Sequence, residues 1–136
     1  LNPQFGDGVD LILGPGRKTI TEATTKLGID LATELPKKGY FFGESISSIP
    51  ADCKRSVVLA DDPDFDVQAA TQLAIGILSR NKKGYFLMVE SDLPGTAAAT
   101  ELQAAEAACV AAGATGSDGP GPGAGWAACA PRLPNP

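Results

Sequence analysis

An uninterrupted run of five apolar residues, Tyr85–Val89, is the strongest hydrophobic signal in the chain. Runs of aromatic and β-branched residues are typical of a strand buried on both faces of a parallel sheet. The run stops at Glu90, and Asp92 follows two positions later. Ligands of open α/β sheets bind beyond the carboxyl ends of the strands, so these carboxylates are candidates for holding a cation or a proton. Periodicity by itself favours the alternative, two solvated residues just past a core strand.

The segment before this run has the pattern of an amphipathic helix. Apolar residues at spacings of three and four share one face, namely Val67, Ala70, Ala74, Ile77 and Leu78. Asp64 or Asp66 is suited to cap the helix, and the basic turn Asn81–Gly84 ends it. Together with a preceding strand at Ser56–Leu59, the helix and the apolar run predict half of a βαβ unit.

Shorter elements alternate upstream in the same way. The expected strands lie at Val9–Leu13 and Tyr40–Phe42, the expected helices at Thr19–Leu27 and from Leu31 to Leu35, and a helical turn at Ser45–Ile49. The fold class is therefore α/β, a small, mostly parallel sheet with flanking helices. Gly14–Lys18 follows the first strand, and its glycine N–H groups and basic residues offer a cradle for an anion. Without a full phosphate-loop pattern, an ordinary strand-to-helix turn is favoured.

The composition changes sharply at Thr96. Residues 96–113 are rich in alanine and predict a helix, whereas residues 114–136 are rich in glycine and proline and predict a linker or disorder, with Trp126 as one anchor. Three segments are expected, an α/β segment at 1–95, the helix at 96–113 and the tail at 114–136. A change of reading frame after Asp92 and a natural, divergent terminus both explain the shift.

The size and charge of the chain limit the classes of protein to which it can belong. With 136 residues, 43% of them hydrophobic, the chain has enough apolar material for one modest core. A net charge of −5 weighs against nucleic acid or an anionic membrane surface as a partner. No run is long and apolar enough to span a bilayer. Because the first residue is Leu1 rather than methionine, a processed or truncated product is expected.

Two features of the composition restrict the chemistry. The chain has no histidine, which removes the usual general base near neutral pH and the commonest zinc ligand. Cys53, Cys109 and Cys129 lie far apart, so a zinc site built from histidine and cysteine is excluded. One disulfide can form in an oxidising compartment, with one thiol left over, but the composition does not settle the compartment.

Three stretches together resemble the alkaline phosphatase family. Leu73–Glu90 looks like the helix and strand that precede a metal site in these enzymes, Val9–Lys18 resembles their glycine-arginine-lysine element, and Lys38–Tyr40 matches the Gly-Tyr that follows. The resemblance covers roughly residues 5–92. It implies a fragment of the alkaline-phosphatase-like sandwich, hydrolysis of phosphate monoesters as the parent activity, and an extracytoplasmic (periplasmic or secreted) location.

By the same resemblance, Glu90 corresponds to the family's magnesium ligand, and Asp92 fits one branch of the family. The family also binds zinc, but Gly95 and Ala99 stand where an aspartate and a histidine bind it in many members, and Pro15 replaces a glycine of the upstream element. The nucleophile motif and the other metal motifs are not found. The chain is therefore expected to be incomplete and inactive alone.

Two other hypotheses stay open. One is a small non-catalytic α/β binding or scaffold module, in which Glu90 and Asp92 hold a divalent cation weakly or only face solvent. The other is one part of an assembly in which a complementing chain supplies the serine and the histidines.

Overall fold

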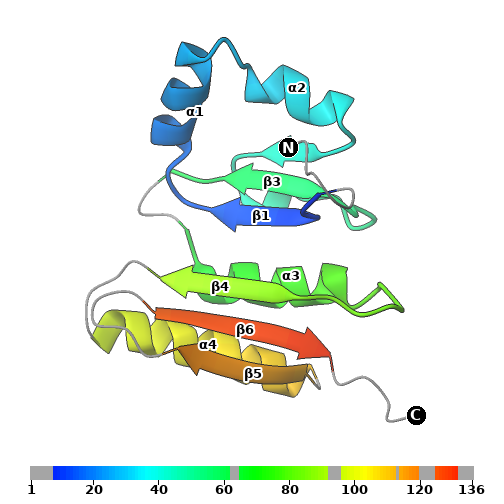
Figure 1. Cartoon of the computed structure of the whole chain (residues 1–136), viewed down its shortest axis with the longest axis vertical. Helices are drawn as coiled ribbons and strands as arrows, with labels where there is room; N and C mark the ends of the chain where they lie inside the picture. Colours follow the sequence, from blue (N-terminus) through cyan, green and yellow to red (C-terminus); the bar gives the residue numbers. More distant parts are fainter. Residues whose placement is uncertain (1–7, 62–64, 92–95, 113, 120–124, 132–136) are drawn as a thin grey trace. The chain divides into compact units, whose positions relative to one another are not determined.

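The computed structural model describes residues 8–61, 65–91, 96–112, 114–119 and 125–131, which form two compact units, Leu1–Phe65 and Asp66–Pro136. The first unit contains a three-stranded parallel sheet in the order β1-β3-β2 (Figure 1). Its elements are β1 (Leu11–Gly14), α1 (Arg17–Lys26), α2 (Leu31–Lys37), β2 (Phe41–Gly43), the 3₁₀ turn η1 (Ile46–Ser48) and β3 (Ser56–Leu59). The predicted α/β class and the parallel sheet are confirmed for this unit.

β3 is the centre of the first unit because it pairs with β1 on one side and β2 on the other. All four of its residues are buried, as expected of a short Val-Val-Leu run in a central parallel strand. Val57 and Leu59 pack with Leu35 of α2 and with Tyr40, and this cluster is the core of the unit.

α1 begins two residues before its predicted start at Thr19. Its N-cap is Gly16, whose φ of 87° lies in the left-handed region that glycine adopts without strain. The chain can therefore turn directly from β1 into the helix, and the Arg17 N–H donates to the Ala60 carbonyl at 3.2 Å. α1 buries no residue, and Leu27, at its C-cap, is 75% exposed.

α2 also extends beyond its predicted end at Leu35, because the helix continues through Pro36 to Lys37. Pro36 lies in the last turn of a short helix that starts at the Asp30 cap, whose carboxylate accepts from the Ala32 N–H at 3.1 Å. A proline there removes only one hydrogen bond near the helix end, where bonding is weakest.

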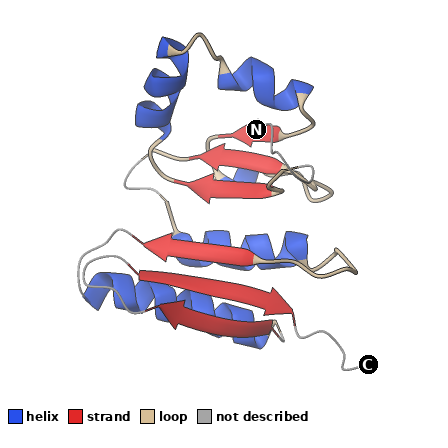
Figure 2. Ribbon diagram, in the orientation of Figure 1, coloured by secondary structure: helices blue, strands red, loops and turns tan. Residues whose placement is uncertain are grey.

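The second unit contains a three-stranded antiparallel sheet in the order β4-β6-β5. Its elements are α3 (Val67–Leu78), β4 (Leu87–Ser91), α4 (Thr96–Ala111), β5 (Ala114–Gly119) and β6 (Gly125–Pro131) (Figure 2). α3 is confirmed with its predicted cap, since the Asp66 carboxylate accepts from the Ala69 N–H at 2.9 Å. α4 packs against α3 and against β4, β5 and β6. Among the described residues, no helix is long and apolar enough to cross a membrane.

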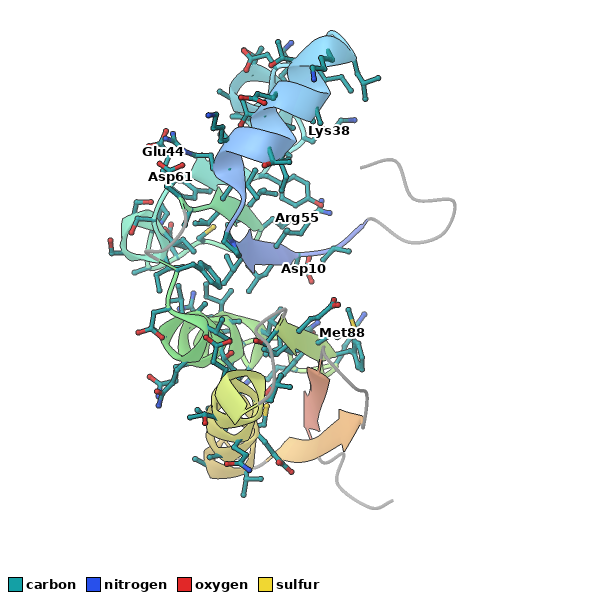
Figure 3. All side chains as sticks on the ribbon, turned by 90° about the vertical axis from the view of Figure 1, so that its left-hand side faces the viewer. Asp10, Lys38, Glu44, Arg55, Asp61 and Met88 are labelled. Atoms are coloured by element: carbon teal, nitrogen blue, oxygen red, sulfur yellow. The ribbon has the colours of Figure 1, made fainter. Side chains whose placement is uncertain are left out.

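The predicted βαβ unit is wrong, because β4 does not join the sheet of β3. β4 pairs antiparallel with β6, from Leu87 opposite Cys129 to Ser91 opposite Gly125. The expected burial on both faces is also wrong, since Val89 is buried while Phe86 is 69% exposed. The physical reason is that α3 and α4 lie on one side of the sheet only (Figures 1 and 3).

The C-terminal segment forms two strands of this sheet where the sequence predicts a linker or disorder. β6 is the central strand, paired with β4 on one side and β5 on the other. A strand ladder is built from backbone hydrogen bonds, so the glycine and alanine residues of β6 can join it without large side chains. Trp126 occupies the backbone position opposite Glu90.

Candidate functional site

Glu90 lies near the end of β4, on the side of the strand that faces away from the helices. Val89 and Ser91, its neighbours, are buried, whereas Glu90 is exposed. This alternation follows from the pleat of a strand, in which successive side chains point to opposite faces. The carboxylate is therefore accessible to solvent and to a dissolved cation. Asp92, the other predicted ligand, lies outside the described residues.

A second carboxylate approaches β4 from the opposite face. The Ser91 hydroxyl donates to Oε2 of Glu101, on α4, at 2.7 Å, and Ser91 is buried. Because Ser91 and Glu90 point to opposite faces, this contact holds Glu101 on the helix side. Glu101 therefore connects α4 to β4 and is not a companion ligand for Glu90.

The described residues do not fit a zinc ion. Among them, no three side chains of histidine, cysteine, aspartate or glutamate gather closely enough to hold a metal. Zinc sites in proteins use at least three protein ligands, and this chain has no histidine. Magnesium keeps several waters and often binds through one or two carboxylates, and Glu90 is the predicted ligand that lies among the described residues.

Charged residues do meet at the carboxyl edge of the parallel sheet, and we call Arg17, Glu44 and Asp61 the Arg17 cluster. Arg17 opens α1 after β1, Glu44 follows β2 directly, and Asp61 lies two residues beyond β3. Arg17 donates from Nε to Asp61 Oδ1 at 3.2 Å and from Nη2 to Oδ2 at 2.8 Å. It also forms an ion pair with Glu44 (Figure 3 labels both acids).

The electrostatics of the Arg17 cluster disfavour an anion. The hydrogen bonds from Arg17 lower the pKa of Asp61, and the bond to Asp61 raises the pKa of Arg17. One cation and two carboxylates leave a net charge of −1, so the guanidinium is already neutralised. The structure thus supports the ordinary turn at Gly14–Lys18 over the anion cradle.

The sequence interpretation missed both acids of this cluster. A signal was present, because Glu44 and Asp61 each lie two residues beyond the end of a predicted strand, and the carboxyl ends of parallel strands meet at one edge. The missing information was the strand order, which brings β1, β2 and β3 together.

A different contact closes the amino end of the same sheet. The Arg55 guanidinium stacks over the Tyr40 ring at 4.4 Å from its centroid, and Arg55 Nη2 donates to the Tyr40 hydroxyl at 2.6 Å. The same hydroxyl donates to the Val9 carbonyl at 2.7 Å. Tyr40 is buried, so these bonds satisfy its only polar atom and fix the strand ends. This arrangement is structural and offers no reactive group.

No protein-family model, no curated protein and no solved structure matches the chain. The likeness to alkaline phosphatases therefore rests on the sequence motifs alone.

Proposed function

We propose that the chain is an alkaline-phosphatase-like segment whose parent reaction is the hydrolysis of phosphate monoesters. The observation that supports this most is the Leu73–Glu90 stretch. It folds as the end of α3, a basic turn and β4, the helix-to-strand order that the resemblance implies, and it leaves the Glu90 carboxylate exposed. An accessible carboxylate near a strand end is suited to contribute one ligand to magnesium.

The same proposal holds that these 136 residues do not hydrolyse phosphate esters alone. In this family the metal ions activate a serine and stabilise the leaving oxygen. The chain has no histidine and no recognisable nucleophile motif, and Gly95 and Ala99 stand at two zinc-ligand positions. The remaining machinery would have to come from residues outside this sequence, in another chain or another part of a longer protein. The family relation also implies an extracytoplasmic location.

A chimera tests the family relation. Residues 9–91 would replace the matching segment of an active alkaline phosphatase, with hydrolysis of 4-nitrophenyl phosphate measured against magnesium concentration. We expect the chimera to hydrolyse the substrate and magnesium to increase its rate. In the Glu90→Gln variant of the chimera, the rate should depend less on the magnesium concentration. Glu22→Gln, an exposed acid on α1, is the matched control and should leave the magnesium dependence unchanged. A folded chimera without turnover, or one in which both variants behave alike, would contradict the proposal.

The isolated chain supplies the complementary measurement. We expect no hydrolysis above background with zinc, magnesium or both. Turnover comparable to that of an intact phosphatase would refute the inactive-alone part of the proposal.

A non-catalytic binding module is the second candidate, favoured by the exposed side chains of Met88 on β4 and of Phe86 just before it. Calorimetric titration of the chain with magnesium helps to separate the two. Heat that disappears in Glu90→Gln supports a descendant of the phosphatase metal site. No heat in either protein leaves Glu90 as a surface residue and counts against the metal site, which the binding module does not require.

A further inference from the structure

Cys109 lies in the last turns of α4, which packs against β4, β5 and β6 in the second unit (Figure 1). The residue is completely buried. It forms a cluster with Ile75 of α3, and Leu87 of β4 packs against that cluster. Cys109 is therefore enclosed between α4 and the sheet by residues of its own unit.

The strand register places a second cysteine on the same face of this sheet. Cys129 of β6 is the backbone partner of Leu87 on β4 and of Gly116 on β5. Residues that pair across an antiparallel ladder lie on one face, because successive positions of a strand alternate between the two faces. Leu87 lies on the face that α4 covers, since it also packs against the cluster of Leu102 and Ala105. The position of Cys129 is therefore on that face too.

A contact at the other end of the sheet fixes the level of α4. The Ser91 hydroxyl donates to Glu101 at 2.7 Å, and Gly125 of β6 is the backbone partner of Ser91. From Glu101 to Cys109 the helix rises about 12 Å. From Gly125 to Cys129 the strand covers about 13 Å. Because these lengths agree, Cys109 and Cys129 lie at the same level, one on the helix and the other on the strand below it.

We propose that Cys109 and Cys129 form a disulfide that links α4 to β6 when the chain meets a small-molecule disulfide such as oxidised glutathione. One cysteine attacks the glutathione disulfide and releases one glutathione, which leaves a mixed disulfide on the protein. The second cysteine attacks the protein sulfur of that bond and releases the other glutathione. Two protein thiols are thereby oxidised, one glutathione disulfide is reduced, and the two thiol protons pass to the released glutathione molecules.

The bond would close a loop of the chain that contains β5. In this structure Cys109 is a buried thiol, so the exchange requires a local opening of the second unit and should be slow. Cys53 is left as the third cysteine. It belongs to the first unit, where its Sγ donates to the Arg55 carbonyl at 3.2 Å. The pairing does not depend on the phosphatase relation, and it requires no metal.

Peptide mapping of the oxidised chain tests which cysteines pair. The 136-residue chain would be incubated without denaturant in excess oxidised glutathione, its remaining thiols alkylated, and the product cleaved before each aspartate. This cleavage yields the peptides 52–60, 92–117 and 118–136, which each contain one cysteine. We expect a disulfide between 92–117 and 118–136, with the cysteine of 52–60 alkylated. A bond that involves 52–60, or three alkylated peptides and no bond, overturns the proposal.

The stability of the oxidised chain shows whether the bond fits the folded structure. This measurement is needed because Cys109 and Cys129 are only about 20 residues apart, which favours their pairing even in an unfolded chain. In Cys53→Ala, denaturation followed by Trp126 fluorescence would be compared between the oxidised and the reduced form. We expect oxidation to lower the unfolding equilibrium constant of the second unit by roughly a hundredfold, because the bond restricts the unfolded chain.

Adding Cys129→Ala to Cys53→Ala gives the matched control, in which oxidised glutathione should leave the fluorescence transition unchanged. The comparison between two redox forms of one protein holds even where a cysteine variant loses some stability. An oxidised form that is no more stable than the reduced form overturns the proposal. Disulfide-linked dimers of Cys53→Ala in place of the internal bond overturn it as well.

Discussion

Arg17 joins two acids that follow two different strands, and it does so through exposed side chains. Its bonds to Asp61 lower the pKa of that carboxyl because they stabilise the ionised form. The folded state therefore binds a proton at Asp61 less readily than the unfolded state does. The resulting stabilisation is present above the ordinary aspartate pKa and is lost as the pH falls through the lowered, folded-state pKa.

The Arg17→Gln substitution should raise the pKa of Asp61 towards its ordinary value. The variant should be slightly less stable than the parent chain at neutral pH, and this difference should vanish once Asp61 is protonated in both. Carboxyl resonances followed by NMR during an acid titration measure the pKa directly. Lys37→Gln, which removes the separate Lys37–Glu34 pair, is the control and should leave the Asp61 titration unchanged. An unshifted Asp61 in Arg17→Gln would show that the hydrogen bonds are not its cause.

Local residue roles could be predicted from the sequence, but contacts between distant residues could not. Asp66 is recognisable as a cap because it precedes an apolar-periodic segment by one position. The Ser91–Glu101 bond depends on how α4 lies against β4, and the Arg17 cluster depends on the strand order. The spacing of residues along the sequence predicts neither arrangement. The structure leaves the predicted metal role of Glu90 and Asp92 untested.

Among the elements, α3 and β3 follow most directly from local physics. β3 is a short apolar run that the structure buries completely, and α3 has a capping residue and a continuous apolar face. β4 is apolar as well, but its burial is decided by its pairing with β6 and by helices on one side only. The sequence therefore predicts that β4 is a strand, but not its partner or its exposed face.

Asp66→Ala should destabilise α3. It removes the acceptor for the Ala69 N–H, and loss of such a cap costs about 1 kcal/mol, within a range of roughly 0.5 to 2. The free energy of unfolding of the second unit, measured with denaturant, should fall by this amount. Asp66→Asn is the matched control, because the amide oxygen can still accept the bond. Equal losses in both variants would point to the charge and not to the cap.

At the scale of the whole molecule, the apolar residues separate into two sets. The cluster around Val57 and Leu59 contains residues of the first unit only, and the clusters around Ile75 and Val89 contain residues of the second only. A division into two small cores was not expected, because the α/β segment was predicted to reach residue 95. The strand–helix–strand pattern predicted that α3 and β4 belong to the first sheet, whereas backbone pairing with β6 places β4 in the second.

Two cores predict two unfolding transitions. Val58 is completely buried in the first unit, and Val58→Ala should lower the stability of that unit by about 2 kcal/mol. Trp126, the single tryptophan, lies in β6 of the second unit, so its fluorescence should report the unfolding of that unit. Val58→Ala should leave this fluorescence transition unchanged. The matched substitution Val89→Ala in the second unit should shift the fluorescence transition instead. If both variants moved both transitions together, the chain would unfold as one cooperative body.

The position of β6 in the chain also sets an order of events during protein synthesis. β4 needs a partner whose residues are translated about 40 positions later, since Leu87 pairs with Cys129. At about 5 to 20 residues per second, the nascent β4 waits roughly two to eight seconds after its own synthesis with both edges open. The first unit has all its strands by residue 59 and has no such delay. The second unit therefore carries the greater risk of aggregation on the ribosome, and a chaperone that binds extended apolar segments would meet the chain at Tyr85–Val89.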